Sequence, residues 1–145
     1  MAQEGYIPTI IDRLCGITEP WAIGEVCESV RSHLECLLNS RQGRDDIPPW
    51  FVELSESLAT YGIGNIDNVD LEDQEERREL IKSIHRAIAL FEPRLDEVSV
   101  IDKGIEHPFV LKLEINAVLR LGRSVEPVVF GTTLRKNGTA HVAQT

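Results

Sequence analysis

The sequence predicts an α+β fold, with N-terminal helices packed on one face of a mainly antiparallel C-terminal β-sheet. Up to Leu95, apolar residues recur at three- and four-residue steps, which is typical of amphipathic helices. After Leu95, apolar and polar residues alternate, which is typical of half-buried strands. Helices first and strands last favour the α+β class. The 145 residues suffice for a single domain, with a loose tail over 1–6, a mainly helical part over 7–95 and a sheet part over 96–143.

The N-terminal half is expected to begin with a short apolar segment and then a long helix. Residues 7–14 are expected to form one or two helical turns, either as a flap on the core or as a docking peptide, and the sequence leaves both open. The long helix is expected over residues 21–39, with Pro20 at its start and Gly43 after its end. Its apolar stripe is Ile23, Val26, Cys27, Val30, Leu34, Leu37 and Leu38. A free thiol is therefore expected to be buried at Cys27.

Two more helices are expected before the sheet. A short one is predicted over residues 50–61, closed by Gly62. A longer one is predicted over residues 71–91, with Asp70 as its N-cap. Its core face is Leu80, Ile81, Ile84, Ala87, Ile88 and Phe91. Because Pro93 disfavours helix at the residue before it, this helix is expected to end at Phe91 or Glu92.

The sheet part is expected to contain up to four strands. The first begins at Val98 and Val100. The second buries Phe109, Leu111, Leu113, Ile115, Ala117 and Leu119, and the third contains Val128, Phe130, Thr132 and Leu134. Asn137 and Gly138 indicate a hairpin turn, because Asn-Gly readily adopts positive φ. A short edge strand over residues 140–143 completes the prediction.

Composition and charge exclude several function classes. The net charge of −9 lies in the helical part: residues 1–50 carry 8 acids and 4 bases, 51–95 carry 10 and 5, and 96–145 carry 6 and 6. No basic stripe is present, so no nucleic-acid binding is expected. No apolar run approaches the length that inserts into a membrane, and the N-terminus lacks a secretory signal, so a cytoplasmic location is expected.

The sequence offers no catalytic, metal or cofactor motif, and no enzyme activity is expected. Four scattered histidines and three cysteines lack metal-ligand spacing. No glycine loop for phosphate is present, and Ser29 and Ser83 lie in expected helices, without a nucleophile elbow. A glycosidase needs two carboxylates across a cleft. Glu92 is a candidate for one, but Arg94 two residues later favours an ion pair that keeps it ionised.

The most informative string is Glu92-Pro93-Arg94-Leu95, between the last helix and the first strand. The proline fixes a stiff corner that carries one acid and one guanidinium. This corner can hold a partner, or Glu92 and Arg94 can pair internally and brace it. The residues alone leave both open.

Five segments together resemble the TssE family, the small baseplate subunits of the bacterial type VI secretion system. That family is similar to the contractile-phage baseplate wedge family once labelled lysozyme-like. The resemblance runs over about residues 7–142, and the matching segments are 8–14, 29–41, 61–62, 89–95 and 129–134. The chain departs from the family pattern at Ser40, where Thr is expected, and at residues 64–66, where Pro-Asp-Leu is more usual.

The resemblance implies a structural subunit in the bacterial cytoplasm, assembled at the baseplate near the inner membrane. Such a subunit joins the wedge proteins TssF and TssG to the first ring of the contractile sheath and helps to initiate sheath assembly. Other baseplate components are further expected partners. The partner-binding residues it implies are Glu92, Pro93, Arg94 and Leu95, and the sheet would act as a template for strand addition. The alternatives are a peptidoglycan hydrolase, following the old label, or an adaptor on the same fold that binds a soluble regulator.

Overall fold

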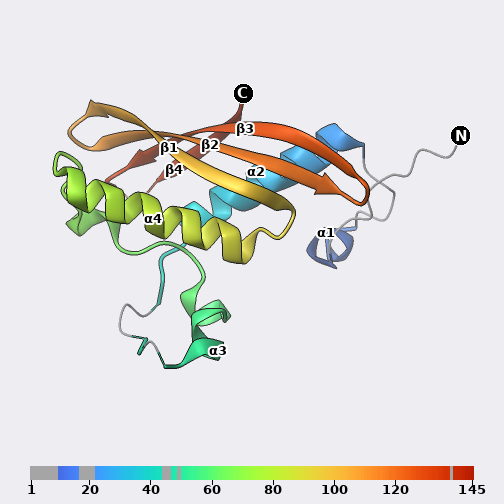
Figure 1. The fold of residues 1–145 in the computed structure, drawn as a ribbon, viewed down its shortest axis with the longest axis horizontal. Helices are drawn as coiled ribbons and strands as arrows, with labels where there is room; N and C mark the ends of the chain where they lie inside the picture. Colours follow the sequence, from blue (N-terminus) through green and yellow to red (C-terminus); the bar gives the residue numbers. More distant parts are fainter. Residues whose placement is uncertain (1–9, 17–21, 44–46, 49, 138) are drawn as a thin grey trace, which may run out of the picture.

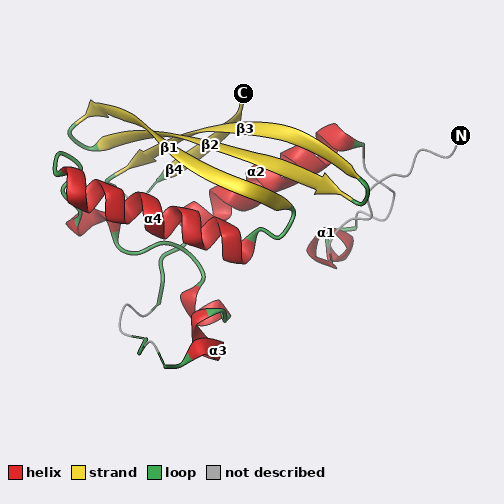
Figure 2. Ribbon diagram, viewed as in Figure 1, coloured by secondary structure: helices red, strands yellow, loops and turns green. Residues whose placement is uncertain are grey.

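The computed structural model describes residues 10–16, 22–43, 47–48, 50–137 and 139–145. The helices are α1 (Ile10–Leu14), α2 (Ile23–Asn39), α3 (Val52–Ser55) and α4 (Gln74–Phe91), with 3₁₀ turns η1 (Leu58–Thr60) and η2 (Ile66–Asn68). The strands are β1 (Leu95–His107), β2 (Val110–Leu121), β3 (Ser124–Arg135) and β4 (Ala140–Gln144). The two long helices, α2 and α4, lie side by side on one face of the sheet (Figures 1 and 2). The predicted α+β class is confirmed.

Helix α2 buries the apolar stripe that the sequence predicts. Its buried residues are Val26, Cys27, Val30, Leu34, Leu37 and Leu38. The helix begins at Ile23 and ends at Asn39, as predicted for its end. Trp21 and Pro20, at its expected start, lie outside the described residues. Cys27 is buried as predicted, and burial raises the pKa of its thiol.

Helix α4 begins three residues later than predicted. Asp73, not Asp70, is the N-cap, because its carboxylate accepts hydrogen bonds from the main-chain N–H groups of Glu75 and Glu76. Asp70 instead closes a turn before the helix, where it accepts from the N–H of Glu72. The C-terminal end is at Phe91, as Pro93 predicts.

The segment between α2 and α4 differs from the prediction of one short helix over residues 50–61. Residues 50–61 instead contain the four-residue α3 and the turn η1, which project away from the sheet below α4 (Figure 1). The hydroxyl of Ser55 donates to the carbonyl of Val52, and that of Ser57 donates to the carbonyl of Leu54. Such local bonds compete with a continuing helix. Several apolar residues of this segment stay exposed: Trp50, Phe51, Val52, Leu54 and Leu58.

The sheet has the order β1-β2-β3-β4, and all neighbouring strands are antiparallel. Its inner face buries Leu111, Leu113, Ile115, Ala117 and Leu119 from β2, as predicted, with Val128, Phe130, Thr132 and Leu134 from β3. Phe109 is a correction: it lies in the β1–β2 turn and is 56% exposed. β1 starts at Leu95, before the predicted Val98. β4 is the predicted edge strand, and Gly138 of the predicted turn lies outside the described residues.

The N-terminal segment is described only from Ile10 onward, so the loose tail expected over 1–6 is outside the described residues. Its helix α1 leaves Ile10 and Leu14 exposed. These two side chains do not form the expected flap on the core, and the docking interpretation stays a prediction. Across the described residues, every helix is too short or too polar to cross a lipid bilayer.

Candidate functional site

The corner between α4 and β1 is a closed turn built by its own main chain. The N–H of Glu92 donates to the carbonyl of Ile88 at 2.9 Å, which ends α4. The N–H of Leu95 donates to the carbonyl of Glu92 at 3.2 Å. The carbonyl of Arg94 accepts from the N–H of Arg120 in β2 at 2.9 Å, which fixes the corner to the sheet. Pro93, between Glu92 and Arg94, further limits the backbone dihedral angles of the corner.

Inside this corner, the Glu92 carboxylate is held by two cationic or polar neighbours. It is 1% exposed and accepts two hydrogen bonds from the Arg94 guanidinium, Nε to Oε1 at 2.7 Å and Nη2 to Oε2 at 2.8 Å. His33 Nδ1 from α2 lies 2.6 Å from Oε2. Because an ionised carboxylate only accepts hydrogen bonds, Nδ1 carries the proton here. Arg94 Nη1 donates to Ser29 Oγ at 3.0 Å. Ser29, His33, Glu92 and Arg94 are called the corner network below.

The corner network sets the charge state of Glu92. Burial on its own would raise the pKa of this carboxyl, but the hydrogen bonds from Arg94 and His33 outweigh it and lower the pKa to about 2. The group is therefore ionised near neutral pH. A general acid must carry a proton near its working pH, so Glu92 does not suit the acid role in sugar hydrolysis.

Tyr61 and Gly62, one of the segments that resemble the family, lie near the same corner. The Tyr61 ring meets the Phe91 ring edge-on, with centroids 5.1 Å apart, and lies 6.4 Å from the His33 ring. Gly62 has φ +106°, and a Cβ there would meet the Ser40 carbonyl oxygen at 2.5 Å. Segments distant in the sequence are thus gathered around one corner.

The four predicted site residues have different environments. Glu92 and Arg94 pair internally, and the Arg94 side chain is 10% exposed. Leu95 is buried in the core, whereas Pro93 is exposed at the tip of the corner. The Glu92–Arg94 ion pair that would brace the corner is therefore present. Partner binding at the corner stays a prediction. Sequence reasoning missed Ser29 and His33, although their four-residue spacing on α2 places both on one side of that helix.

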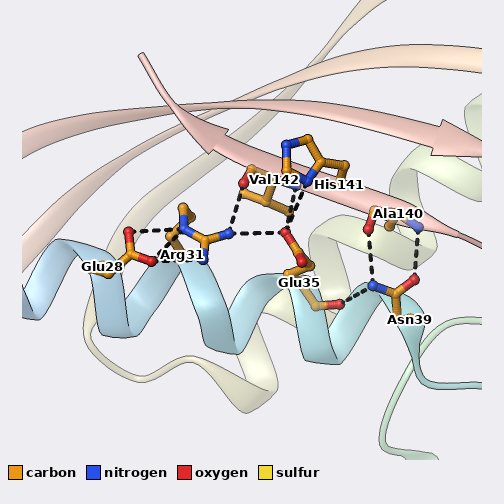
Figure 3. Close-up of polar contacts among 7 residues, drawn as sticks. All are labelled: Glu28, Arg31, Glu35, Asn39, Ala140, His141 and Val142. Atoms are coloured by element: carbon orange, nitrogen blue, oxygen red, sulfur yellow. Dashed lines mark hydrogen bonds and ion pairs between the residues drawn. The ribbon is translucent and has the colours of Figure 1, made fainter.

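A second polar cluster joins α2 to the edge strand β4 (Figure 3). Asn39 Oδ1 accepts from the N–H of Ala140 at 2.7 Å, and its Nδ2 donates to the carbonyl of Ala140 at 3.0 Å. Glu35 Oε2 accepts from the N–H of Val142 at 3.1 Å, and Arg31 Nη1 donates to the carbonyl of Val142 at 3.0 Å. We call Arg31, Glu35 and Asn39 the α2 clamp. No pattern in the sequence predicts this cluster.

Within the clamp, the charged side chains also bond to one another. Arg31 pairs with Glu35 at 3.0 Å and with Glu28, one turn earlier, at 2.7 Å. His141 Nδ1 lies 3.4 Å from Glu35 Oε2. These contacts fix the side chains that face β4 in position.

Two further features of the described residues concern metal binding and pockets. In the described ranges, no three His, Cys, Asp or Glu side chains gather as they would to hold a metal ion. A pocket of about 570 Å³ lies between α4 and residues 47–62. Glu79 is the one carboxylate among its described lining residues, and it pairs with Lys82 at 2.7 Å. Glycoside hydrolysis needs a pair of carboxylates, and the described lining of this pocket contributes one.

Comparison with known proteins places most of the chain in a known family. The family model of baseplate wedge protein gp25 matches residues 25–123, more than half of the chain. A search of curated proteins finds no match, and a search of solved structures finds none either. The matched residues include the whole corner network and the Tyr61–Gly62 motif, whereas β4 lies beyond them.

Proposed function

Because the chain belongs to the baseplate wedge protein gp25 family, we propose that it is a TssE-type structural subunit of a type VI secretion baseplate. In this role it links the wedge proteins TssF and TssG to the first ring of the contractile sheath and helps to initiate sheath assembly. It would act in the bacterial cytoplasm, near the inner membrane. The observation that carries the proposal is that the family match spans every residue of the corner network.

The corner is proposed as the contact with the wedge. The internal Glu92–Arg94 pair and the Ser29 and His33 bonds hold its shape, which lowers the conformational entropy lost on binding. Pro93 is exposed at the tip and would touch the partner directly. Leu95 anchors the corner in the core from the other side. The four predicted residues would thus form one binding site: Glu92 and Arg94 hold its shape, Pro93 contacts the partner, and Leu95 anchors the corner in the core.

The sheet is proposed as the contact with the sheath. A four-stranded sheet ends in two edge strands, here β1 and β4. An edge strand can take up an extended segment of a partner, with main-chain hydrogen bonds giving affinity and alternate side chains giving specificity. Addition of a sheath segment would also cover an edge that could otherwise aggregate.

We further propose that the subunit is not an enzyme. Support comes from the low pKa of Glu92, which keeps it ionised, and from the single, ion-paired carboxylate in the described lining of the pocket. Both features argue against the peptidoglycan-hydrolase alternative.

A complementation experiment tests the proposed function. Arg94→Ala would remove the guanidinium that pairs with the buried Glu92 and weaken the fold, so a loss of function there has two explanations. Pro93→Lys leaves that pair in place and adds bulk and charge at the exposed tip. Pro108→Lys, at an exposed proline in the β1–β2 turn, is the matched control.

The readout is fluorescent sheath assembly in cells that lack the gene. Wild type and Pro108→Lys should restore sheaths, and Pro93→Lys should not, although its thermal stability should match that of Pro108→Lys, which also loses a proline. Full sheath assembly with Pro93→Lys would refute the corner as the wedge contact. Failure of the wild-type gene to restore any sheaths would refute the function itself.

A further inference from the structure

We infer that a partner strand adds to this sheet at β1, because the α2 clamp already occupies the free edge of β4. The inference rests on the proposed function, in which the sheet takes up an extended sheath segment. Two observations support it. The first is which residues of β1 and β4 direct their main-chain N–H and carbonyl groups outward, and the second is which of these groups already form hydrogen bonds.

In β4, the even-numbered residues point their main-chain groups away from the sheet. The N–H of Arg135 donates to the carbonyl of Thr139, and the N–H of Thr145 donates to the carbonyl of Val129. Because the direction of main-chain bonding alternates along an antiparallel pair, odd-numbered residues from 139 to 145 face β3. Ala140, Val142 and Gln144 therefore face outward.

The clamp takes up the outward groups of the first two of these residues. The N–H and carbonyl of Ala140 both bond to Asn39, while the N–H of Val142 bonds to Glu35 and its carbonyl to Arg31 (Figure 3). All four bonds that an added strand would need at these residues are thus made within the chain. Two of them involve a charged side chain and are stronger than neutral ones. A partner strand would have to displace this set.

In β1, the same alternation identifies outward-facing main-chain groups that described side chains do not occupy. The N–H of Arg120 donates to the carbonyl of Arg94, so even-numbered residues of β2 face β1. The register then directs the main-chain groups of Ser99 and Ile101 toward β2, and those of Val100 and Asp102 outward. Among the described residues, no side chain bonds to the main chain of Val100 or Asp102.

The open stretch of β1 is short. On its N-terminal side, the carbonyl of Val98 lies 2.9 Å from His85 Nε2 of α4. Register shifts interrupt the pairing with β2 between Asp96 and Ser99 and again between Asp102 and Gly104. Such irregularities bend an edge and end regular pairing. We therefore expect only a few residues of the partner strand to pair here, centred on Val100.

The side chains beside this stretch indicate the kind of segment that fits. Val98 and Val100 are half-buried against the core. A strand placed next to them would continue the same face, so the partner residue beside Val100 should be apolar. The partner is thus an extended segment of a sheath subunit with an apolar residue at its centre.

Amide hydrogen exchange of the full chain by NMR tests the geometry without any partner. The amides of Ala140 and Val142 should exchange slowly, and those of Val100 and Asp102 at least tenfold faster. Asn39→Ala should accelerate Ala140 at least tenfold, while the matched control Asn68→Ala, at an exposed asparagine, should not. Equal protection at Val100 and Val142 in the free protein would overturn the assignment of the edges.

Sheath assembly in cells tests the consequence. Proline at an outward-facing edge position removes an outward N–H while keeping the pairing to the neighbouring strand. Val100→Pro should abolish sheath assembly, and Gln144→Pro, the matched substitution at the end of β4, should leave it intact. The reverse result, equal loss, or assembly with both variants would each overturn β1 as the single docking edge.

Two controls separate this inference from the proposed function. If the wild-type gene restores no sheaths, the proposed function fails, whatever the exchange data show about the two edges. If Val100→Pro does not fold, exchange of the wild-type protein with and without purified sheath subunits decides. Protection of the Val100 amide should then rise at least tenfold on mixing, and an unchanged rate at Val100 would overturn the inference.

Discussion

Acidification should weaken this protein through Glu92 in particular. The carboxyl has a pKa of about 2 in the fold, against an ordinary value of 4.5. At about 1.4 kcal/mol per pH unit, this gap corresponds to about 3 kcal/mol of folding free energy. Because the folded-state pKa is the lower one, the contribution is complete above about pH 4.5 and is lost as the pH falls toward 2. More than half should be gone at about pH 3.

The assay compares the wild type with Glu92→Gln by urea unfolding at several pH values from 7 to 3, at constant ionic strength. Glu53→Gln, at an exposed glutamate of α3, removes the same charge and serves as the matched control. The difference in unfolding free energy between wild type and Glu92→Gln should shrink by about 2 kcal/mol between pH 7 and pH 3. For Glu53→Gln it should stay constant within about 0.5 kcal/mol.

A difference for Glu92→Gln that does not change with pH would refute the reasoning. It would mean that Arg94 and His33 do not hold this carboxyl in its ionised form, and that the corner is not braced by charge. The corner would then not be held in a preorganised shape by its ion pair.

Two further substitutions test local features of the fold. Gly62→Ala should cost about 2 kcal/mol or more, because φ is +106° and the new Cβ would meet the Ser40 carbonyl, whereas Gly64→Ala, with no atom within 4 Å, should be close to neutral. Equal urea midpoints for these two variants would contradict this account. Thr132→Val should raise the unfolding free energy by about 1 kcal/mol, because the buried Thr132 hydroxyl has no hydrogen-bond partner among the described residues. A lowered melting temperature for this variant would show that the hydroxyl is satisfied in solution.

The long periodic elements were predictable from the sequence. Helices α2 and α4 and strand β2 each carry enough apolar residues at one spacing to fix their type and their buried face. The end of α4 was predictable because Pro93 acts locally on the residue before it. The segment over residues 50–61 was not predictable, because serine hydroxyl bonds interrupt a helix whose apolar pattern would otherwise continue.

The candidate site was predictable only in part. Glu92 and Arg94 are near neighbours in the sequence, so their pairing was one of two open interpretations. Their bonds to Ser29 and His33 join residues about 60 positions apart, and no local pattern encodes such a contact. The α2 clamp escaped notice for a related reason. Polar residues on the outer side of an amphipathic helix are usually solvated, and only the tertiary fold brings them to β4.

We propose above that this baseplate-family protein joins a wedge to a sheath. The most direct test is to purify the tagged protein from its native cells and identify what elutes with it by mass spectrometry, wild type beside Pro93→Lys. Wild type should recover TssF, TssG and sheath subunits, and Pro93→Lys should lose TssF and TssG. Recovery of none of these proteins with the wild type would contradict the account.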